Sequence, residues 1–68
     1  MNLAGMSTPG LLKLYGAVRE TLEIDDALHL AGLPKVHGVR DFPDWRVWSD
    51  ALAVELENRG IKYQKVDW

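Results

Sequence analysis

Residues 35–68 read KVHGVRDFPDWRVWSDALAVELENRGIKYQKVDW, and this stretch decides the fold that the sequence predicts. Residues 36–39 form a short β-prone run. Residues 45–58 then follow without glycine or proline, and residues 61–66 alternate between apolar and polar side chains over their first five positions. A helix of about seventeen residues, from about residue 42 to residue 59, between two such runs is the spacing of a right-handed βαβ crossover. We expect the two strands to pair in parallel.

The expected helix carries recognisable signals at both ends. Asp41 can accept hydrogen bonds from the first backbone N–H groups, and Pro43 suits the first turn because it has no N–H to leave unpaired. Glu55 stands four residues before Arg59, which is the favourable order for an ion pair on a helix. Gly60 occupies the position where a left-handed residue commonly ends a helix.

The first half of the chain predicts one amphipathic helix. Ser7-Thr8-Pro9 supplies a hydroxyl cap followed by a proline in the first turn. Apolar side chains then recur at spacings of four, three and four residues, which places them on one helix face: Leu11, Tyr15, Val18 and Leu22. Gly16 lies inside this helix, where we expect close packing against another backbone in preference to a hinge.

Residues 24–33 leave two interpretations open. They can form a short helix or irregular turn, capped by Asp25 and closed by Gly32 and Pro34. Alternatively, residues 27–30 form a strand that turns and pairs with residues 36–40. We favour the first interpretation.

The expected fold class is therefore α+β or small α/β. An N-terminal amphipathic helix precedes a strand-helix-strand unit whose sheet has two or three strands. Residues 1–68 make a single small domain, in which residues 1–6 are expected to be loose. The core predicted from helical and strand spacing comprises Leu11, Tyr15, Val18, Leu22, Val36, Val39, Trp45, Trp48, Leu52, Leu56 and Ile61.

Composition narrows the classes of function. The chain contains no cysteine, which leaves no disulfide, no thiolate zinc site and no thiol redox chemistry. The net charge of −2 argues against a dedicated nucleic-acid binder, which usually presents a basic face. The first six residues lack the basic start and long apolar core of a signal peptide, and no apolar run reaches membrane-spanning length. We therefore expect a cytoplasmic protein with no membrane partner.

The sequence contains only weak signals of a catalytic or metal-binding site. His29 and His37 are eight residues apart, and Asp25 and Asp26 could join His29 as metal ligands, although solvated polar residues explain the pattern better. Ser7 is better explained as a helix cap, and Ser49 as a residue at the edge of a packed face. The sequence contains neither the glycine pattern of a P-loop nor that of a dinucleotide-binding fold. We expect no enzyme, no catalytic residue, no metal and no cofactor.

The segment Arg59-Gly60-Ile61-Lys62-Tyr63 resembles the end of the helix and the following strand in the opening βαβ segment of glutaredoxin-like proteins. The resemblance covers about half of the chain. In that family the redox chemistry resides in cysteine in the loop that enters the helix. Here that loop reads Phe42-Pro43-Asp44-Trp45 and has no cysteine. The resemblance thus implies the local βαβ topology and no activity.

The helix of residues 42–59 has two apolar arcs. One contains both of its tryptophans, and we expect it to face the sheet: Trp45, Trp48, Leu52 and Leu56. The other contains Val47, Ala51 and Val54, and should meet either the first helix, which we favour, or a partner. This surplus of apolar surface, together with open sheet edges, predicts a small non-enzymatic protein-interaction or accessory domain that is able to form homo-oligomers.

The predicted partner-binding surface comprises Arg40, Tyr63 and Trp68. A tryptophan is costly to leave in water, so Trp68 should bind a partner or a second copy unless it folds back onto the protein's own helix, which is slightly favoured. The alternative function is nucleic-acid binding by the sheet face, with stacking on an aromatic ring. That face would be lined by Lys35, Arg40, Lys62, Tyr63 and Lys65.

Overall fold

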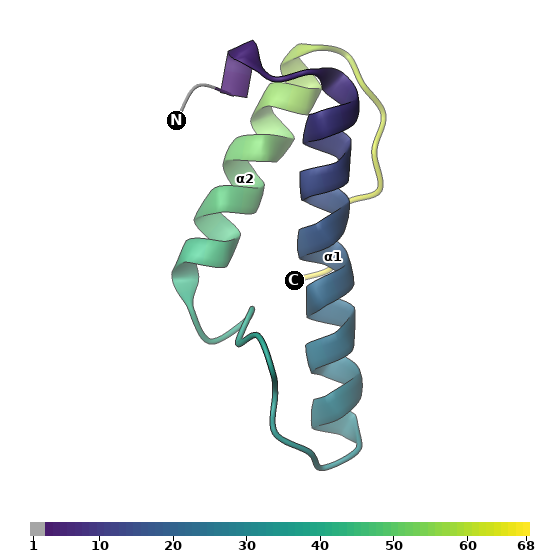
Figure 1. The fold of residues 1–68 in the computed structure, drawn as a ribbon, viewed down its shortest axis with the longest axis vertical. Coiled ribbons are helices and arrows are strands. Elements are labelled where there is room, and N and C mark those ends of the chain that lie inside the picture. Colours follow the sequence, from purple (N-terminus) through teal and green to yellow (C-terminus); the bar gives the residue numbers. More distant parts are fainter. Residues whose placement is uncertain (1–2) are drawn as a thin grey trace.

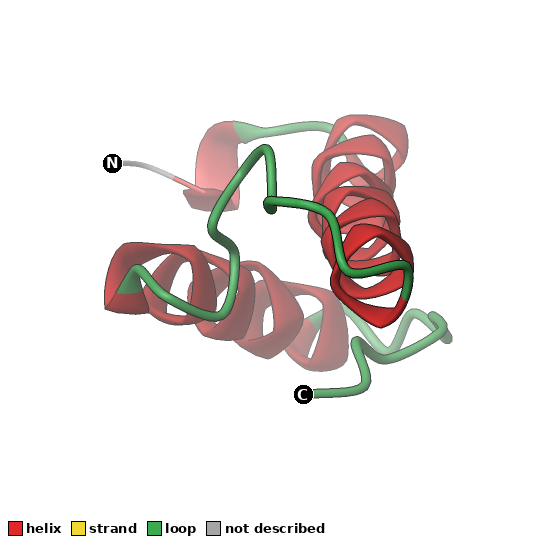
Figure 2. Cartoon of the chain, turned by 90° about the horizontal axis from the view of Figure 1, so that it is seen from below, coloured by secondary structure: helices red, strands yellow, loops and turns green. Residues whose placement is uncertain are grey.

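The computed structural model describes residues 3–68, which form three helices and no strand. A single 3-10 turn, η1 (Leu3–Gly5), precedes the long helix α1 (Thr8–Leu30) and the shorter helix α2 (Pro43–Asn58). Figure 1 shows α1 and α2 side by side, joined by a long loop, and Figure 2 shows the same pair from below. Over its described residues the chain is therefore all-α. The predicted α/β class and its βαβ unit are wrong.

The first predicted strand, residues 36–39, is a turn because its backbone bonds to a side chain of α1. The amides of Val36, His37 and Val39 donate to the carboxylate of Asp25. Gly38 has a φ of 67°, and its carbonyl accepts from the amides of residues 41 and 42, which reverses the chain. These N–H groups are consequently not available to a neighbouring strand.

The second predicted strand, residues 61–66, runs past the helices without a sheet partner among residues 3–68. Val66 is buried, and its amide donates to the hydroxyl of Tyr15 in α1 at 2.9 Å. Ile61 and Tyr63 are half-buried against the core. The alternation that predicted a strand thus marks a segment with one side against two helices, an environment that selects the same residues. The topology implied by the glutaredoxin-like resemblance is wrong for the same reason.

Helix α1 is longer than the sequence predicted. Ser7 caps its first turn by accepting from the amide of Gly10 at 3.1 Å, as expected. Residues 24–30, which left a short helix, a turn and a strand open, continue the same helix, so Asp25 does not cap a separate one. The helix ends at Leu30, and Gly32 follows its C-cap in the left-handed conformation, as the favoured interpretation predicted. The φ of Gly32 is 74°, and the amide of Leu33 donates to the carbonyl of Leu28.

Helix α2 begins and ends close to its predicted boundaries. Proline occupies its first turn, but Phe42 is the N-cap and makes no side-chain capping bond, so the predicted cap by Asp41 is wrong. Asp41 instead lies 3.6 Å from the ammonium group of Lys35. Gly60, with φ of 70°, ends the helix, and the predicted ion pair of Arg59 with its i−4 partner is formed at 3.1 Å.

The core lies between α1 and α2 and is closed by the loop and the C-terminal segment. Eight apolar side chains are buried there: Leu11, Tyr15, Val18, Leu22, Val39, Leu52, Leu56 and Val66. All but Val66 were predicted. Trp45, Trp48 and Ile61 are half-buried against this core. Val36 was predicted as core but is 70% exposed, because its turn directs the amide and not the side chain toward α1.

Gly16 does not pack closely against a backbone. A Cβ built on it would meet no atom within 4 Å, so the expectation of close packing is wrong. The N-terminal residues are bonded to the end of α2. The guanidinium of Arg59, its C-cap residue, donates to the carbonyls of Leu3 and Ala4 and to the hydroxyl of Thr8. The expected looseness of residues 1–6 remains a prediction, since residues 1 and 2 lie outside the described part of the chain.

Within residues 3–68, neither helix combines the length and the apolar character that a membrane span requires.

Candidate functional site

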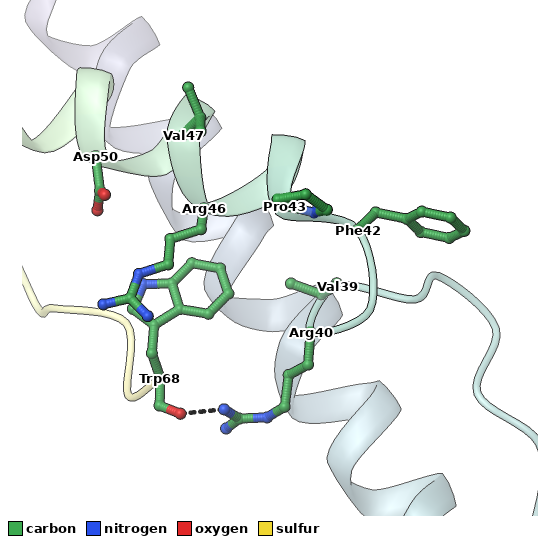
Figure 3. A pocket seen from close by; sticks show the side chains of 8 residues that line it. All are labelled: Val39, Arg40, Phe42, Pro43, Arg46, Val47, Asp50 and Trp68. Atoms are coloured by element: carbon green, nitrogen blue, oxygen red, sulfur yellow. Dashed lines mark hydrogen bonds between the residues drawn. The ribbon is translucent and has the colours of Figure 1, made fainter.

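A groove of about 400 Å³ lies where the loop, the start of α2 and the C-terminal segment meet (Figure 3). Its apolar lining includes the ring of Trp68 and, at the rim, Phe42, whose ring Figure 3 shows directed away from Trp68. Its polar groups are two guanidinium groups and one carboxylate. The complete lining comprises Val39, Arg40, Phe42, Pro43, Arg46, Val47, Asp50 and Trp68. The structure thus brings Arg40 and Trp68, two of the three predicted partner-binding residues, into one site.

Asp25 holds the loop that forms one wall of the groove. Its side chain is fully buried, and its two oxygens accept from the amides of Val36 at 3.2 Å, His37 at 3.0 Å and Val39 at 2.9 Å. Burial alone would raise the pKa of the carboxyl, but the three N–H donors and the nearby His37 outweigh it and keep the pKa below its ordinary value of 3.8. The carboxylate therefore organises the loop in its charged form.

Asp26, the next residue of α1, fixes the second wall through Arg40. The guanidinium donates to both carboxylate oxygens, at 2.9 Å and 3.0 Å, which is the bidentate geometry favoured by arginine. It also donates to the backbone carbonyls of Asp67 and Trp68, and Figure 3 shows the bond to Trp68. The hydrogen bond from Arg40 lowers the pKa of Asp26. One arginine thereby joins α1, the loop and the C-terminal segment.

Trp68 has one side against the protein and one side in the groove. It is half-buried and packs against the core, so the folding back that the sequence favoured is observed. Its ring also lies 5.6 Å from the guanidinium carbon of Arg46, and Figure 3 shows Arg46 stacked beside it. No ion pair joins Arg46 to another residue of the described chain. Arg46 therefore contacts the Trp68 ring without forming an ion pair, although the carboxylate of Asp50 lines the same groove one helical turn away.

Tyr63, the third predicted partner-binding residue, lies outside the groove. Its ring packs edge-on against that of Tyr15, with centroids 4.9 Å apart and planes at 74°. Its hydroxyl donates to the carboxylate of Glu57 at 2.6 Å. This hydrogen bond, together with burial, raises the pKa of Tyr63 to about 12. Whether Arg40, Tyr63 or Trp68 contacts a partner remains a prediction.

The surface proposed for nucleic acid depends on a sheet, and the described residues form none. Two of its five members are engaged by other groups, Arg40 by Asp26 and Tyr63 by Glu57. Lys35 is near Asp41. Lys62 and Lys65 lie on the exposed side of the C-terminal segment. These five residues therefore do not lie on a sheet face, on which the predicted stacking of bases depended.

The residues weighed for chemistry have structural partners. Both carboxylates that could have joined His29 as ligands are bonded, that of Asp25 to the loop and that of Asp26 to Arg40. Ser49 is fully buried, and its hydroxyl donates to the carbonyl of Arg46 within α2. Among residues 3–68, no group of three or more histidine, cysteine or acidic side chains is placed to hold a metal ion.

Comparison of the chain with protein families, curated proteins and solved structures gave no significant match.

Sequence reasoning missed the apolar part of the groove. Phe42 and Val47 are 61% and 68% exposed, although both are large apolar residues. A signal for Val47 was present, because it belongs to the second apolar arc of α2 with Ala51 and Val54. That arc was expected to meet the first helix, but it is exposed, since the arc with Leu52 meets α1 instead. Phe42 gave no signal, because its neighbours predicted only a helix start.

Proposed function

We propose that this chain is a small non-enzymatic protein-interaction domain, whose binding surface is the groove and the apolar residues beside it. The observation that carries the proposal is the exposure of Phe42 and Val47 next to a wall that is already ordered. Small soluble proteins rarely expose large apolar side chains together unless these contact another molecule. Arg46 supplies a cation next to the ring of Trp68. Arginine and tryptophan are both enriched among the residues that contribute most of the binding energy at protein–protein interfaces.

The fixed wall of the groove supports a role in binding a partner, and not only a role in packing the chain's own core. Asp25 and Asp26 fix the backbone and the guanidinium on one side of the groove before any partner arrives. A preorganised surface loses less conformational entropy on association than a mobile one, so more of the contact energy appears as affinity. The expected partner places an apolar side chain against Trp68, Pro43 and Val47 and an acidic group near Arg46.

Site-specific photo-cross-linking in cells tests this function. A photoreactive phenylalanine derivative at Val47 should cross-link to a specific protein, whereas the same residue at Ala17, exposed on α1 and outside the groove, should not. Arg46→Ala should reduce the cross-link at position 47, because it removes a groove cation that forms no ion pair within the described chain. Equal and non-specific cross-linking from both positions would contradict the proposal.

A cytoplasmic location remains part of the proposal. Cell fractionation of a tagged chain tests it, and recovery of the chain in an extracytoplasmic fraction would contradict it.

A further inference from the structure

We propose that the partner of the outer face of α2 is a second copy of this chain, paired antiparallel about a two-fold axis near Ala51. The inference rests on the proposed interaction function and names a partner for it. The face consists of Val47, Ala51 and Val54, here called the outer stripe. Its two valines are 68% and 56% exposed, and its members recur at spacings of four and three residues, which aligns them along one side of the helix.

The stripe is complementary to itself in shape. A two-fold axis perpendicular to α2 at Ala51 brings Val47 of one copy opposite Val54 of the other, and the reverse contact follows from symmetry. Ala51 then faces its own counterpart. Its small side chain lets the helix backbones approach closely, while the two valines on either side interdigitate.

Two of the three charged side chains along one edge of the stripe, those of Arg46 and Glu57, are also complementary to each other across the two-fold axis. Arg46 and Glu57 are eleven residues apart, which is about three turns and roughly 16 Å, so they lie on the same edge of α2. The two-fold axis places Arg46 of each copy beside Glu57 of the other, which forms two equivalent ion pairs. Arg46 has no ion-pair partner among residues 3–68.

Glu57 remains able to accept such a bond. Only its Oε1 is engaged within the chain, by the hydroxyl of Tyr63, and a carboxylate can accept several hydrogen bonds. Asp50 lies on the same edge and approaches its counterpart near the axis. Arg46, one turn away in each copy, offsets part of this repulsion.

The size of the surface predicts a weak dimer. The chain exposes 4715 Å², against about 4,300 Å² expected for a compact monomer of 7.7 kDa. The face of α2 is about 24 Å long and about 10 Å wide, so pairing covers a few hundred Å² per copy. A standard interface covers about 800 Å² per partner. Pairing through so small a face should be weak and transient, so association is measured at protein concentrations from about 10 μM to 1 mM.

Sedimentation equilibrium over that concentration range tests the proposal. The wild-type chain should show a reversible monomer–dimer equilibrium. Val54→Asp should abolish it, because it places a charge in the stripe without touching the groove. Lys13→Glu, a charge change at an exposed position of α1, serves as the matched control and should dimerise like wild type. Circular dichroism confirms that each variant is folded.

A charge-reversal experiment tests the symmetry itself. Arg46→Glu and Glu57→Arg should each weaken the dimer about tenfold, because each puts two pairs of like charges in contact. An equimolar mixture of the two variants should associate again, since every reversed side chain then faces an opposite charge. This rescue cannot arise from damage to the fold of either variant.

The outcomes separate this inference from the proposed function. A wild-type chain that stays monomeric, or a mixture no better than its components, overturns the dimer. In that case, a cross-link from position 47 to a different protein still supports the interaction function. If the dimer forms and position 47 cross-links to its own copy, the two proposals stand together.

Discussion

Replacement of Gly38 by alanine should destabilise the protein at the turn that forms the groove. The glycine has a φ of 67°, a conformation that costs an L-residue about 1–2 kcal/mol. A Cβ at this position would also lie 2.7 Å and 2.8 Å from the Cε2 and Cδ2 atoms of Phe42. The ring would have to leave its rotamer, at about 0.5–1.5 kcal/mol. Together these effects give about 1.5–3.5 kcal/mol, or a fall in Tm of roughly 6–28 °C for a chain of this size.

Gly16→Ala provides a matched control with the opposite expected sign. Gly16 lies inside α1 with a helical backbone, and an added methyl group meets no atom within 4 Å. The same chemical change should therefore stabilise the chain by about 0.5–1 kcal/mol and raise Tm by about 2–8 °C. Thermal melts followed by circular dichroism measure both variants.

A double-mutant cycle separates the two causes. If the ring contributes as the geometry indicates, Gly38→Ala should cost about 0.5–1.5 kcal/mol less in a Phe42→Ala background than in wild type. The cost that remains is that of the backbone. A neutral or stabilising effect of Gly38→Ala in wild type would show that the turn does not have this conformation.

Three further predictions concern the core and two hydrogen-bonded side chains. Leu52→Ala, at a fully buried position, should cost about 2–5 kcal/mol in chemical denaturation, and an unchanged midpoint would contradict the helix packing. Asp25 has a lowered pKa, so the stability that its carboxylate contributes should be complete above pH 3.8 and should disappear as the pH falls through its folded-state pKa. Asp25→Asn should flatten this acid dependence of the unfolding free energy. Tyr63 has a raised pKa, so its contribution to stability should persist below pH 10 and vanish as the pH rises through about 12. Tyr63→Phe should remove this alkaline loss of stability. A tyrosinate absorbance titration that shows an ordinary pKa would count against the bond to Glu57.

The helices and most of the core could be predicted because they depend on neighbouring residues. The end of α2 follows from Gly60, the start of α1 follows from Ser7, and helical spacing identified both packed faces. These are interactions over three or four positions, which a sequence displays directly. The buried residues Leu52 and Leu56 follow from the same periodicity.

The missing sheet could not be foreseen, because one distant side chain decides it. Three amides of the turn bond to Asp25, more than ten positions earlier in the chain, and nothing in residues 36–39 indicates such an acceptor. Residues 61–66 have the composition of a strand because they lie on an apolar surface, whether that surface is a sheet or a pair of helices. For the candidate site, Trp68 was predicted because a tryptophan is costly to leave in water, and Arg40 because it was expected nearby, whereas the contribution of Asp26 to their positions depends on tertiary contacts.

The bond between Asp25 and the loop makes local opening of the groove observable. The amides of Val36, His37 and Val39 are protected from solvent exchange only while the carboxylate holds them, so their hydrogen-exchange rates report the opening of this wall separately from global unfolding. A partner that binds only the closed groove must slow exchange at these amides in proportion to its occupancy. The loop therefore carries its own reporter of binding, readable without any label and before a partner has been identified.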